Sequence, residues 1–180
     1  MVKVYTAGHS NRAAQQFVEM LAVNGISELV DVRAHPGSRR NPQFNQDSLR
    51  AALAGAEIRY HWAGKHLGGL RKATADSPHC ALLTALQGYA EHMQGEDFAG
   101  AVQQLRQLAA RARLAIMCAE RDPEHCHRSL IADYLLAAGD RVAHLLSADE
   151  RCEHGLNAAA RQTARGLVYD RLTQATLALE

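Results

Sequence analysis

The sequence predicts an α/β protein: a single three-layer domain in which helices flank a mainly parallel five-stranded sheet. Short apolar runs of strand length alternate along the chain with longer stretches of helical periodicity, which is the pattern of successive βα units. The chain has 180 residues, of which 47% are hydrophobic. A chain of this size buries about 70% of the surface that its unfolded form exposes, so one self-sufficient core is expected.

Five apolar runs have the length and composition of strands. Leu29, Val30 and Val32 nearly fill the second run, and the fourth run begins with Leu114 and continues through Met117. Near-continuous apolar runs are typical of strands that are buried on both faces of a parallel sheet. We expect strands at residues 2–6, 28–33, 58–62, 114–119 and 141–146.

Helical periodicity fills most of the segments between these runs, and Gly25 ends the first helix where a left-handed backbone is needed. Residues 34–44 hold two prolines and a glycine, which excludes regular structure there. A glycine-rich stretch from Gly64 opens a long loop that reaches Pro78. We expect helices at residues 13–24, 46–54, 80–93, 96–111, 125–138 and 156–179. Residues 1–146 should therefore form the α/β domain, and residues 147–180 a C-terminal helical extension.

The net charge and the cysteine content argue against several classes of protein. The chain has 20 Lys and Arg against 19 Asp and Glu, so its net charge gives no long-range attraction to nucleic acid or to an anionic membrane. No apolar stretch approaches the ~18 residues of a membrane span. The four cysteines form no CxxC pair, and their irregular spacing favours reduced thiols over a disulfide framework. We expect a cytoplasmic protein with no membrane partner.

Polar residues follow the predicted strands directly, and this places them at one edge of the sheet. Ligands of parallel α/β sheets gather beyond the carboxyl ends of the strands, where loops converge and helix N-termini point their free amides. The candidate ligand-binding residues that follow the first, second and fourth strands are His9, Ser10, Arg33, Ser38, Arg39 and Arg128. Guanidinium groups match phosphate oxygens, so Arg33, Arg39 and Arg128 are expected to clamp an anion, although a solvated basic loop is the alternative for Arg39.

The segment from Cys126 to Ser129 opens the helix that follows the fourth strand. A cysteine in the first turn of a helix has its thiolate favoured by the helix dipole, which makes Cys126 a candidate nucleophile. His127 and Glu120 are candidates for acid and base catalysis. A plain packing role is equally compatible with Cys126, and it is favoured for Cys118 within its apolar strand.

Several motifs resemble one bacterial family, which is catalogued as domain of unknown function 488. The resemblance spans about residues 4–146 and departs at Ala7, where the family more often has isoleucine. The resemblance implies that the chain belongs to this family, which is defined by its motifs and not by an established reaction. The motifs are Thr6-Ala7-Gly8-His9-Ser10, Val30-Asp31-Val32-Arg33 with residues 36–44, Leu67-Gly68-Gly69, Met117-Cys118-Ala119-Glu120 and Cys126-His127-Arg128-Ser129.

These observations favour an enzyme, a Cys/His/Glu-dependent hydrolase or transferase. Its anion-binding cleft would take a phosphorylated, nucleotide or nucleic-acid-related ligand. A non-catalytic anion-binding, nucleic-acid-binding or sensor module is one alternative. Another is a metal-binding protein that uses cysteine, histidine and glutamate side chains at the same cleft, drawn from His9, Cys118, Glu120, Cys126 and His127. The sequence identifies neither a cofactor nor an oligomeric state.

Overall fold

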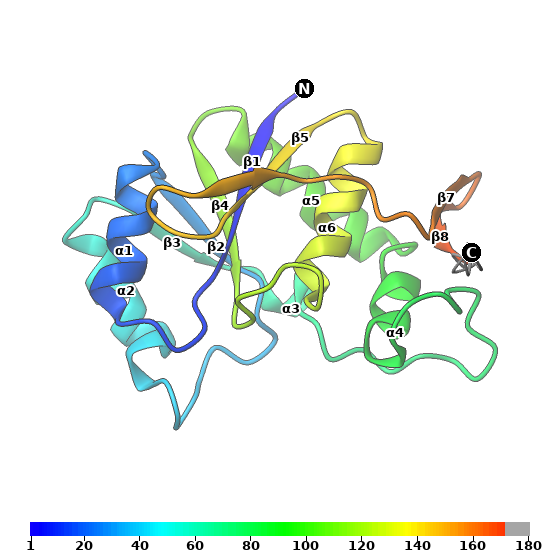
Figure 1. The fold of residues 1–180 in the computed structure, drawn as a ribbon, viewed down its shortest axis with the longest axis horizontal. Helices are drawn as coiled ribbons and strands as arrows, with labels where there is room; N and C mark the ends of the chain where they lie inside the picture. The colour runs from blue at the N-terminus through cyan, green and yellow to red at the C-terminus, as the bar shows by residue number, and fades with distance from the viewer. Residues whose placement is uncertain (172–180) are drawn as a thin grey trace, which may run out of the picture.

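The computed structural model describes residues 1–171 and has the predicted α/β architecture (Figure 1). The strands of its main sheet are β1 (Lys3–Gly8), β2 (Glu28–Asp31), β3 (Arg59–Trp62), β4 (Leu114–Cys118), β5 (Arg141–Leu145) and β6 (Arg151–Glu153). They lie in the order β3-β2-β4-β1-β5-β6. The first five are parallel and correspond to the predicted strands, whereas β6 adds an antiparallel edge beside β5.

Helices cover both faces of the sheet, as the three-layer prediction requires. α1 (Ala14–Val23) and α2 (Gln46–Ala54) cover one face, and α5 (Glu96–Ala109) and α6 (His127–Ala137) cover the other (Figure 1). Alternating side chains divide the core accordingly: Met117 packs beneath α1 and α2, and Ile116 packs beneath α5 and α6. α4 (Thr84–His92) joins the second layer through Tyr89.

The strand register brings the carboxyl ends of β1, β2 and β4 together. Gly8 at the end of β1 pairs with Cys118 at the end of β4, and Asp31 at the end of β2 pairs with Met117. The backbone N–H of His9 donates to the carbonyl oxygen of Cys118 at 3.0 Å, which continues the pairing past the strand. The residues that follow these three strands therefore start from one edge.

Three segments before α5 differ from prediction. The proline-containing loop includes a short 3-10 helix, η1 (Pro42–Phe44), and the glycine-rich loop opens with one helical turn, α3 (Gly64–Leu67). The helix predicted from residue 80 begins at Thr84. Its first residues are held differently because the Ala81 N–H donates to the carbonyl oxygen of Tyr169 at 3.0 Å.

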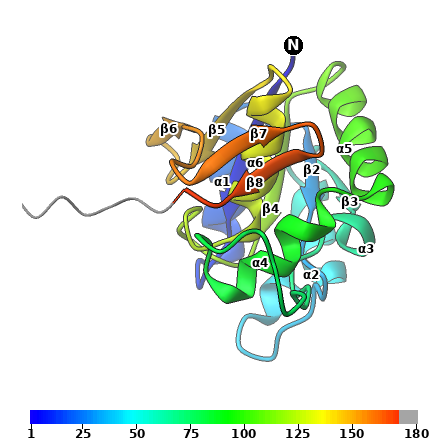
Figure 2. The same cartoon turned by 90° about the vertical axis from the view of Figure 1, so that its right-hand side faces the viewer.

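The C-terminal helix predicted at residues 156–179 is wrong wherever the structure describes it. The chain there forms a hairpin of β7 (Ala160–Thr163) and β8 (Gly166–Tyr169), which lies in front of α6 in Figure 2. Ala160, Leu167 and Tyr169 are buried in the main core, which favours the hairpin over a weakly amphipathic helix. The rest of the predicted helix lies outside the described residues, and the division of the chain at residue 146 stays a prediction.

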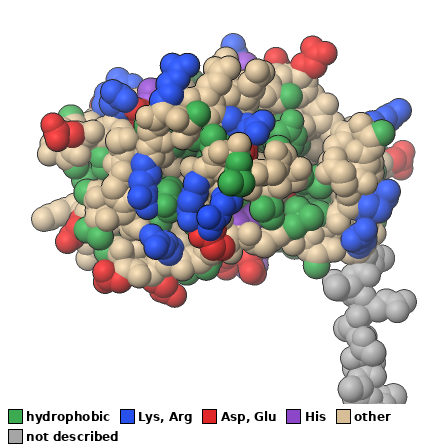
Figure 3. All heavy atoms as spheres, turned by 90° about the horizontal axis from the view of Figure 1, so that it is seen from above, with side chains coloured by type: hydrophobic (Ala, Val, Ile, Leu, Met, Phe, Trp, Pro, Cys, Tyr) green, Lys and Arg blue, Asp and Glu red, His purple; other side chains and the backbone are tan. Residues whose placement is uncertain are grey.

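Several basic side chains on the edge where the strands begin are paired with acids. Figure 3 looks onto this edge and shows Lys and Arg side chains among acidic ones. Lys3 contacts Glu153 at 2.8 Å, and Arg106 contacts Asp140 at 2.6 Å. Within residues 1–171, none of the helices has the combination of length and apolar character that crossing a bilayer demands.

Two helical glycines should respond in opposite ways to the same substitution. Gly100 in α5 has open space around it, since a Cβ there would meet nothing within 4 Å. A Cβ on Gly88 in α4 would lie 2.4 Å from the carbonyl oxygen of Arg71. Gly100→Ala should raise the free energy of unfolding by about 0.5–1 kcal/mol, and Gly88→Ala should lower it by about 1–3 kcal/mol. Urea unfolding measures both, and equal signs would contradict the packing of α4 on the long loop.

Candidate functional site

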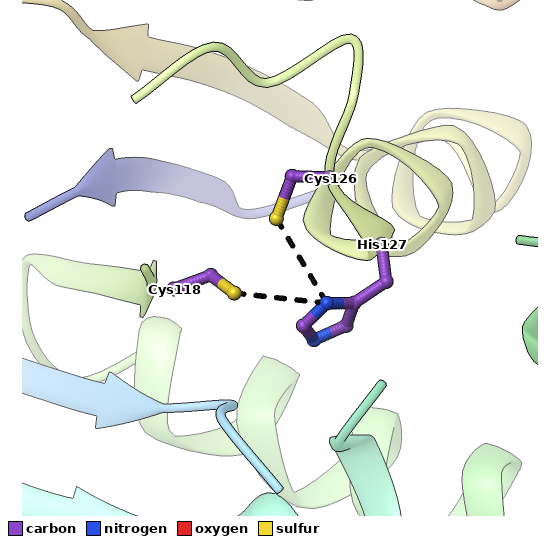
Figure 4. A group of neighbouring side chains, drawn as sticks. All are labelled: Cys118, Cys126 and His127. Atoms are coloured by element: carbon purple, nitrogen blue, oxygen red, sulfur yellow. Dashed lines mark hydrogen bonds between the residues drawn. The ribbon is translucent and has the colours of Figure 1, made fainter. Parts of the chain in front are cut away.

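Two thiols and one imidazole meet at the carboxyl end of β4. Cys118 is the last residue of that strand, and Cys126 is the N-cap of α6, with extended backbone angles of φ −125° and ψ 141°. Cys126 thus precedes the first helical turn in which it was predicted to lie. Both sulfur atoms point at the same ring nitrogen of His127 (Figure 4). The Nδ1 atom lies 3.7 Å from the Cys118 sulfur and 3.8 Å from the Cys126 sulfur.

The orientation of the His127 ring is fixed from three sides. Its Nε2 lies 3.0 Å from the carbonyl oxygen of Val32, an acceptor that places the ring proton on Nε2 and leaves the Nδ1 lone pair facing the sulfurs. The ring packs edge-on against Tyr89, with centroids 4.9 Å apart. Gly69 permits the approach of the glycine-rich loop, because a Cβ at that position would lie 2.9 Å from Nδ1.

Burial and mutual hydrogen bonding separate the acidities of the two thiols. A hydrogen bond from Cys126 holds the pKa of Cys118 well below its usual range against the opposing effect of burial, and the His127 ring in its protonated form lowers it further. The hydrogen bond to Cys118 and burial raise the pKa of Cys126. The pair therefore favours a Cys118 thiolate that accepts a hydrogen bond from the Cys126 thiol.

This cluster can act chemically in two ways. Its three donor atoms lie within 4.8 Å of one another, and Cys118, Cys126 and His127 are all buried. Thiolate and imidazole are ligands that zinc and similar ions prefer. The same thiolate beside an imidazole is also the arrangement of an activated nucleophile.

Arg33 is engaged by the protein itself. It is 6% exposed, and its guanidinium group contacts both carboxylate oxygens of Asp31, with the Nη2 to Oδ2 distance at 2.6 Å. It also donates to the carbonyl oxygen of Phe44 at 2.8 Å. An anion would have to displace these acceptors, so the geometry does not favour Arg33 as a free clamp.

His9 belongs to the same buried group. Its ring stacks on Phe44 with centroids 4.2 Å apart, and its Nδ1 lies 2.7 Å from the carbonyl oxygen of Ser10. Burial lowers the pKa of His9, and the nearby Arg33 lowers it further. A neutral imidazole whose Nε2 lies 3.2 Å from the Arg33 guanidinium packs here, and a ligand-binding role for His9 stays a prediction.

Arg128 is buried without a carboxylate partner. It is 1% exposed, and its guanidinium group donates to the backbone carbonyl oxygens of Glu120 and Arg121. Gly8 makes this approach possible, because a Cβ there would lie 1.8 Å from the Glu120 carbonyl oxygen and 2.9 Å from Nη1 of Arg128. Arg128 therefore fastens the loop after β4 against β1.

Positive charge accumulates around that loop. Arg12 donates to the carbonyl oxygens of Gly8 and Leu146. Burial lowers the pKa of Arg12, and the charges of Arg121 and Arg128 lower it further. Among the ion pairs of residues 1–171, none includes any of these three arginines. The ends of β1 and β4 thus carry positive charge without a paired carboxylate.

The other predicted site residues lie outside the thiol–imidazole cluster. Glu120 is exposed, and its carboxylate is not part of the cluster. The backbone N–H of Ser10 donates to the Ala119 carbonyl oxygen at 2.8 Å. The Ser38 hydroxyl accepts the backbone N–H of Asn41 at 3.1 Å, which shapes its own loop, and Arg39 is exposed. Acid–base catalysis by Glu120 stays a prediction, and so do ligand contacts by Ser10, Ser38 and Arg39.

Sequence reasoning missed two parts of this region. A packing role was favoured for Cys118, which was otherwise named only among the alternative metal ligands, although it shares a strand face with Leu114 and Ile116 and so had to point toward α6. Arg12 and Arg121 were not selected at all. Their positions four and three residues beyond the β1 and β4 ends were the available signal.

Comparison with known proteins identifies the family of this chain but gives no activity for it. No curated protein and no solved structure matches this chain. A family described as Domain of unknown function DUF488 matches residues 13–135, which is more than half of the chain. The match includes Arg33, Cys118, Cys126, His127 and Arg128. The protein therefore belongs to the DUF488 family.

Proposed function

We propose that the protein is an enzyme whose reactive centre is a thiophilic divalent metal ion, of the zinc class, held by Cys118, Cys126 and His127. The observation that carries this proposal is the spacing of the donor atoms. Around tetrahedral zinc, with bonds of about 2.3 Å to sulfur and about 2.0 Å to nitrogen, neighbouring donors lie about 3.5–3.8 Å apart. The Nδ1 atom of His127 lies 3.7 Å and 3.8 Å from the two sulfurs, and all three donor atoms lie within 4.8 Å of one another, so one ion fits after a small contraction of the cluster.

The surroundings of His127 support a metal ligand. A ligating histidine usually gives its other ring N–H to a carbonyl or carboxylate, which is the relation of Nε2 to the Val32 carbonyl oxygen. The cluster supplies three ligands from the described residues. Three protein ligands leave a coordination position for water or substrate, and bound water loses its proton more easily.

The substrate class we propose is an anionic, phosphate-bearing ligand, such as a nucleotide or a nucleic-acid component. Support comes from Arg121, which is exposed beyond the end of β4. The half-buried Arg12 and the buried Arg128 add positive charge beside it, although their guanidinium groups are held by backbone carbonyl oxygens. Guanidinium groups bind phosphate oxygens well. A cytoplasmic location is part of the proposal, because ligating thiolates require reduced cysteines.

A second candidate function is metal-free nucleophilic catalysis. The lowered pKa of Cys118 favours it, since a thiolate beside an imidazole attacks electrophilic carbon or phosphorus. In this reading Cys118, and not Cys126, would be the nucleophile. Cys126 would donate a hydrogen bond to it, and His127 would accept or return the proton.

Metal binding is tested by titrating the reduced, metal-free protein with Co²⁺. We expect one ion per chain, with the thiolate charge-transfer absorption of a cobalt–sulfur bond. Cys118→Ser and His127→Ala should each weaken binding by more than about 100-fold, which exceeds the usual effect of residues around a metal ligand.

The matched controls for that titration are Cys80→Ser and Cys152→Ser, because both thiols are exposed and free. These variants should bind Co²⁺ as the wild type does. The proposal fails if the metal-free protein binds no ion, or if the exposed cysteines account for the absorption.

Alkylation of the metal-free protein tests the nucleophile. Because the pKa of Cys118 is lowered, its rate with iodoacetamide should change little from neutral to mildly alkaline pH. The rate at Cys152, whose pKa is raised chiefly by burial, should rise with pH over the same range. Mass spectrometry of each modified peptide gives the two profiles. Parallel profiles would remove the second candidate, and protection of Cys118 by Zn²⁺ would support the first.

Anion binding is tested by calorimetry with pyrophosphate at low salt. Arg121→Gln should weaken binding by about 10-fold, the effect of losing one charge-assisted hydrogen bond. Arg165→Gln, in the exposed β7–β8 turn, is the control and should bind as the wild type does. Equal affinity in all three proteins would argue against the proposed substrate class.

A further inference from the structure

A pocket of about 590 Å³ is lined by residues other than those of the thiol–imidazole cluster. Its walls come from the start of α4, from residues 123–125, from α6 and from residues 152–158. The volume is in the range of sites for small organic molecules, about 300–1,000 Å³. No part of the function proposed above uses this pocket.

The polar floor of the pocket is a closed chain of hydrogen bonds. Thr6 Oγ1 lies 2.7 Å from His144 Nδ1, His144 Nε2 lies 2.9 Å from His154 Nδ1, and His154 Nε2 lies 2.9 Å from Asp133. The Tyr169 hydroxyl donates to the other Asp133 oxygen at 3.0 Å. All four ring nitrogens thus have partners within the protein, so both rings offer carbon surface to a ligand.

An apolar wall faces this floor. Leu82, Leu83 and Leu86 line the pocket around the start of α4, and Leu156 lines it from the segment after β6. Leu83 is 61% exposed and Leu156 is 45% exposed, so the pocket mouth presents large apolar side chains to water. Exposed apolar groups around a hollow are typical of a binding site.

The charge of the pocket is negative. Three of its lining residues are acidic, namely Glu124, Asp133 and Glu153, and the lining includes no lysine or arginine. The pKa of the lining Cys152 is raised, first by burial and then by Glu150, Glu124 and Glu153. Within residues 1–171, Asp133 and Glu153 have basic or imidazole partners, whereas Glu124 has none. Glu124 is therefore the carboxylate available to a ligand.

We propose that this pocket binds a small organic cation with an apolar body, such as an aryl or alkyl amine. The apolar body packs between the leucines and the two imidazole rings, and the ammonium group lies near Glu124. This preference is opposite to that of the arginine-rich end of β1 and β4. The pocket therefore stands independently of the metal centre and its anionic substrate, as a second site.

Three probes that share a phenylethyl group and differ in its polar end test the proposal by calorimetry: phenethylamine, phenethyl alcohol and phenylpropionate. We expect phenethylamine to bind most tightly and phenylpropionate most weakly. Glu124→Gln should weaken phenethylamine by about 2–5-fold, the effect of one exposed ion pair, and should leave phenethyl alcohol unchanged. Glu57→Gln, an exposed glutamate outside the pocket lining, is the matched control.

The location of binding is read from NMR. The carbon-bound ring protons of His144 and His154 should shift on addition of phenethylamine, and those of the exposed His35 should not. Binding of no probe, equal binding of the amine and the carboxylate, or an unchanged affinity in Glu124→Gln would each overturn the proposal.

Discussion

The contact between His127 Nε2 and the Val32 carbonyl oxygen is the constraint on which the candidate site depends. It spans 3.0 Å and joins the first residue of α6 to the residue after β2. Without it, either ring nitrogen could carry the proton, and the lone pair would not have to face the sulfurs. With it, the position of α6, the tautomer of His127 and the direction of the Nδ1 lone pair are fixed by one contact. The cost of burying an imidazole is offset because both of its nitrogens have partners.

The polar residues at the carboxyl edge of the sheet form two groups, one on each face of the sheet. Asp31, Arg33 and His9 gather around Phe44, which belongs to the core beneath α1 and α2. Cys118 and Cys126 belong to the core beneath α5 and α6. The first group is a closed ion-pair network, and breaking a buried pair of this kind costs about 3–5 kcal/mol. It holds the loop after β2 through the contact of Arg33 with the Phe44 carbonyl oxygen. The second group supplies the donor atoms of the proposed metal centre.

The sequence predicted the parallel core because its signal is local. Runs such as Leu114 to Met117 must be buried on both faces, and short apolar runs between helical stretches imply parallel order. The C-terminal hairpin could not be found in this way. Its strands are short, and they are stabilised by burial of Tyr169 and by the bond from Ala81, contacts that join residues far apart in the chain.

The sequence identified candidate site residues by their chemical type, but it did not identify the groups that each of them contacts. Cys126 and His127 were selected because they open a helix after a strand, and the structure places them together. Arg33 and Arg128 were chosen as anion clamps, but the partners of a guanidinium group depend on tertiary geometry. The proximity of Asp31 two residues before Arg33, on the same side of the strand, was a signal for their pairing.

The most direct test of the metal centre is X-ray absorption at the zinc edge of the Zn²⁺-loaded protein. A site built from Cys118, Cys126 and His127 predicts two sulfur ligands at about 2.3 Å and one imidazole nitrogen at about 2.0 Å, with a light atom completing the shell. A first shell of oxygen and nitrogen alone, or one that keeps both sulfurs in Cys118→Ser, would contradict the account.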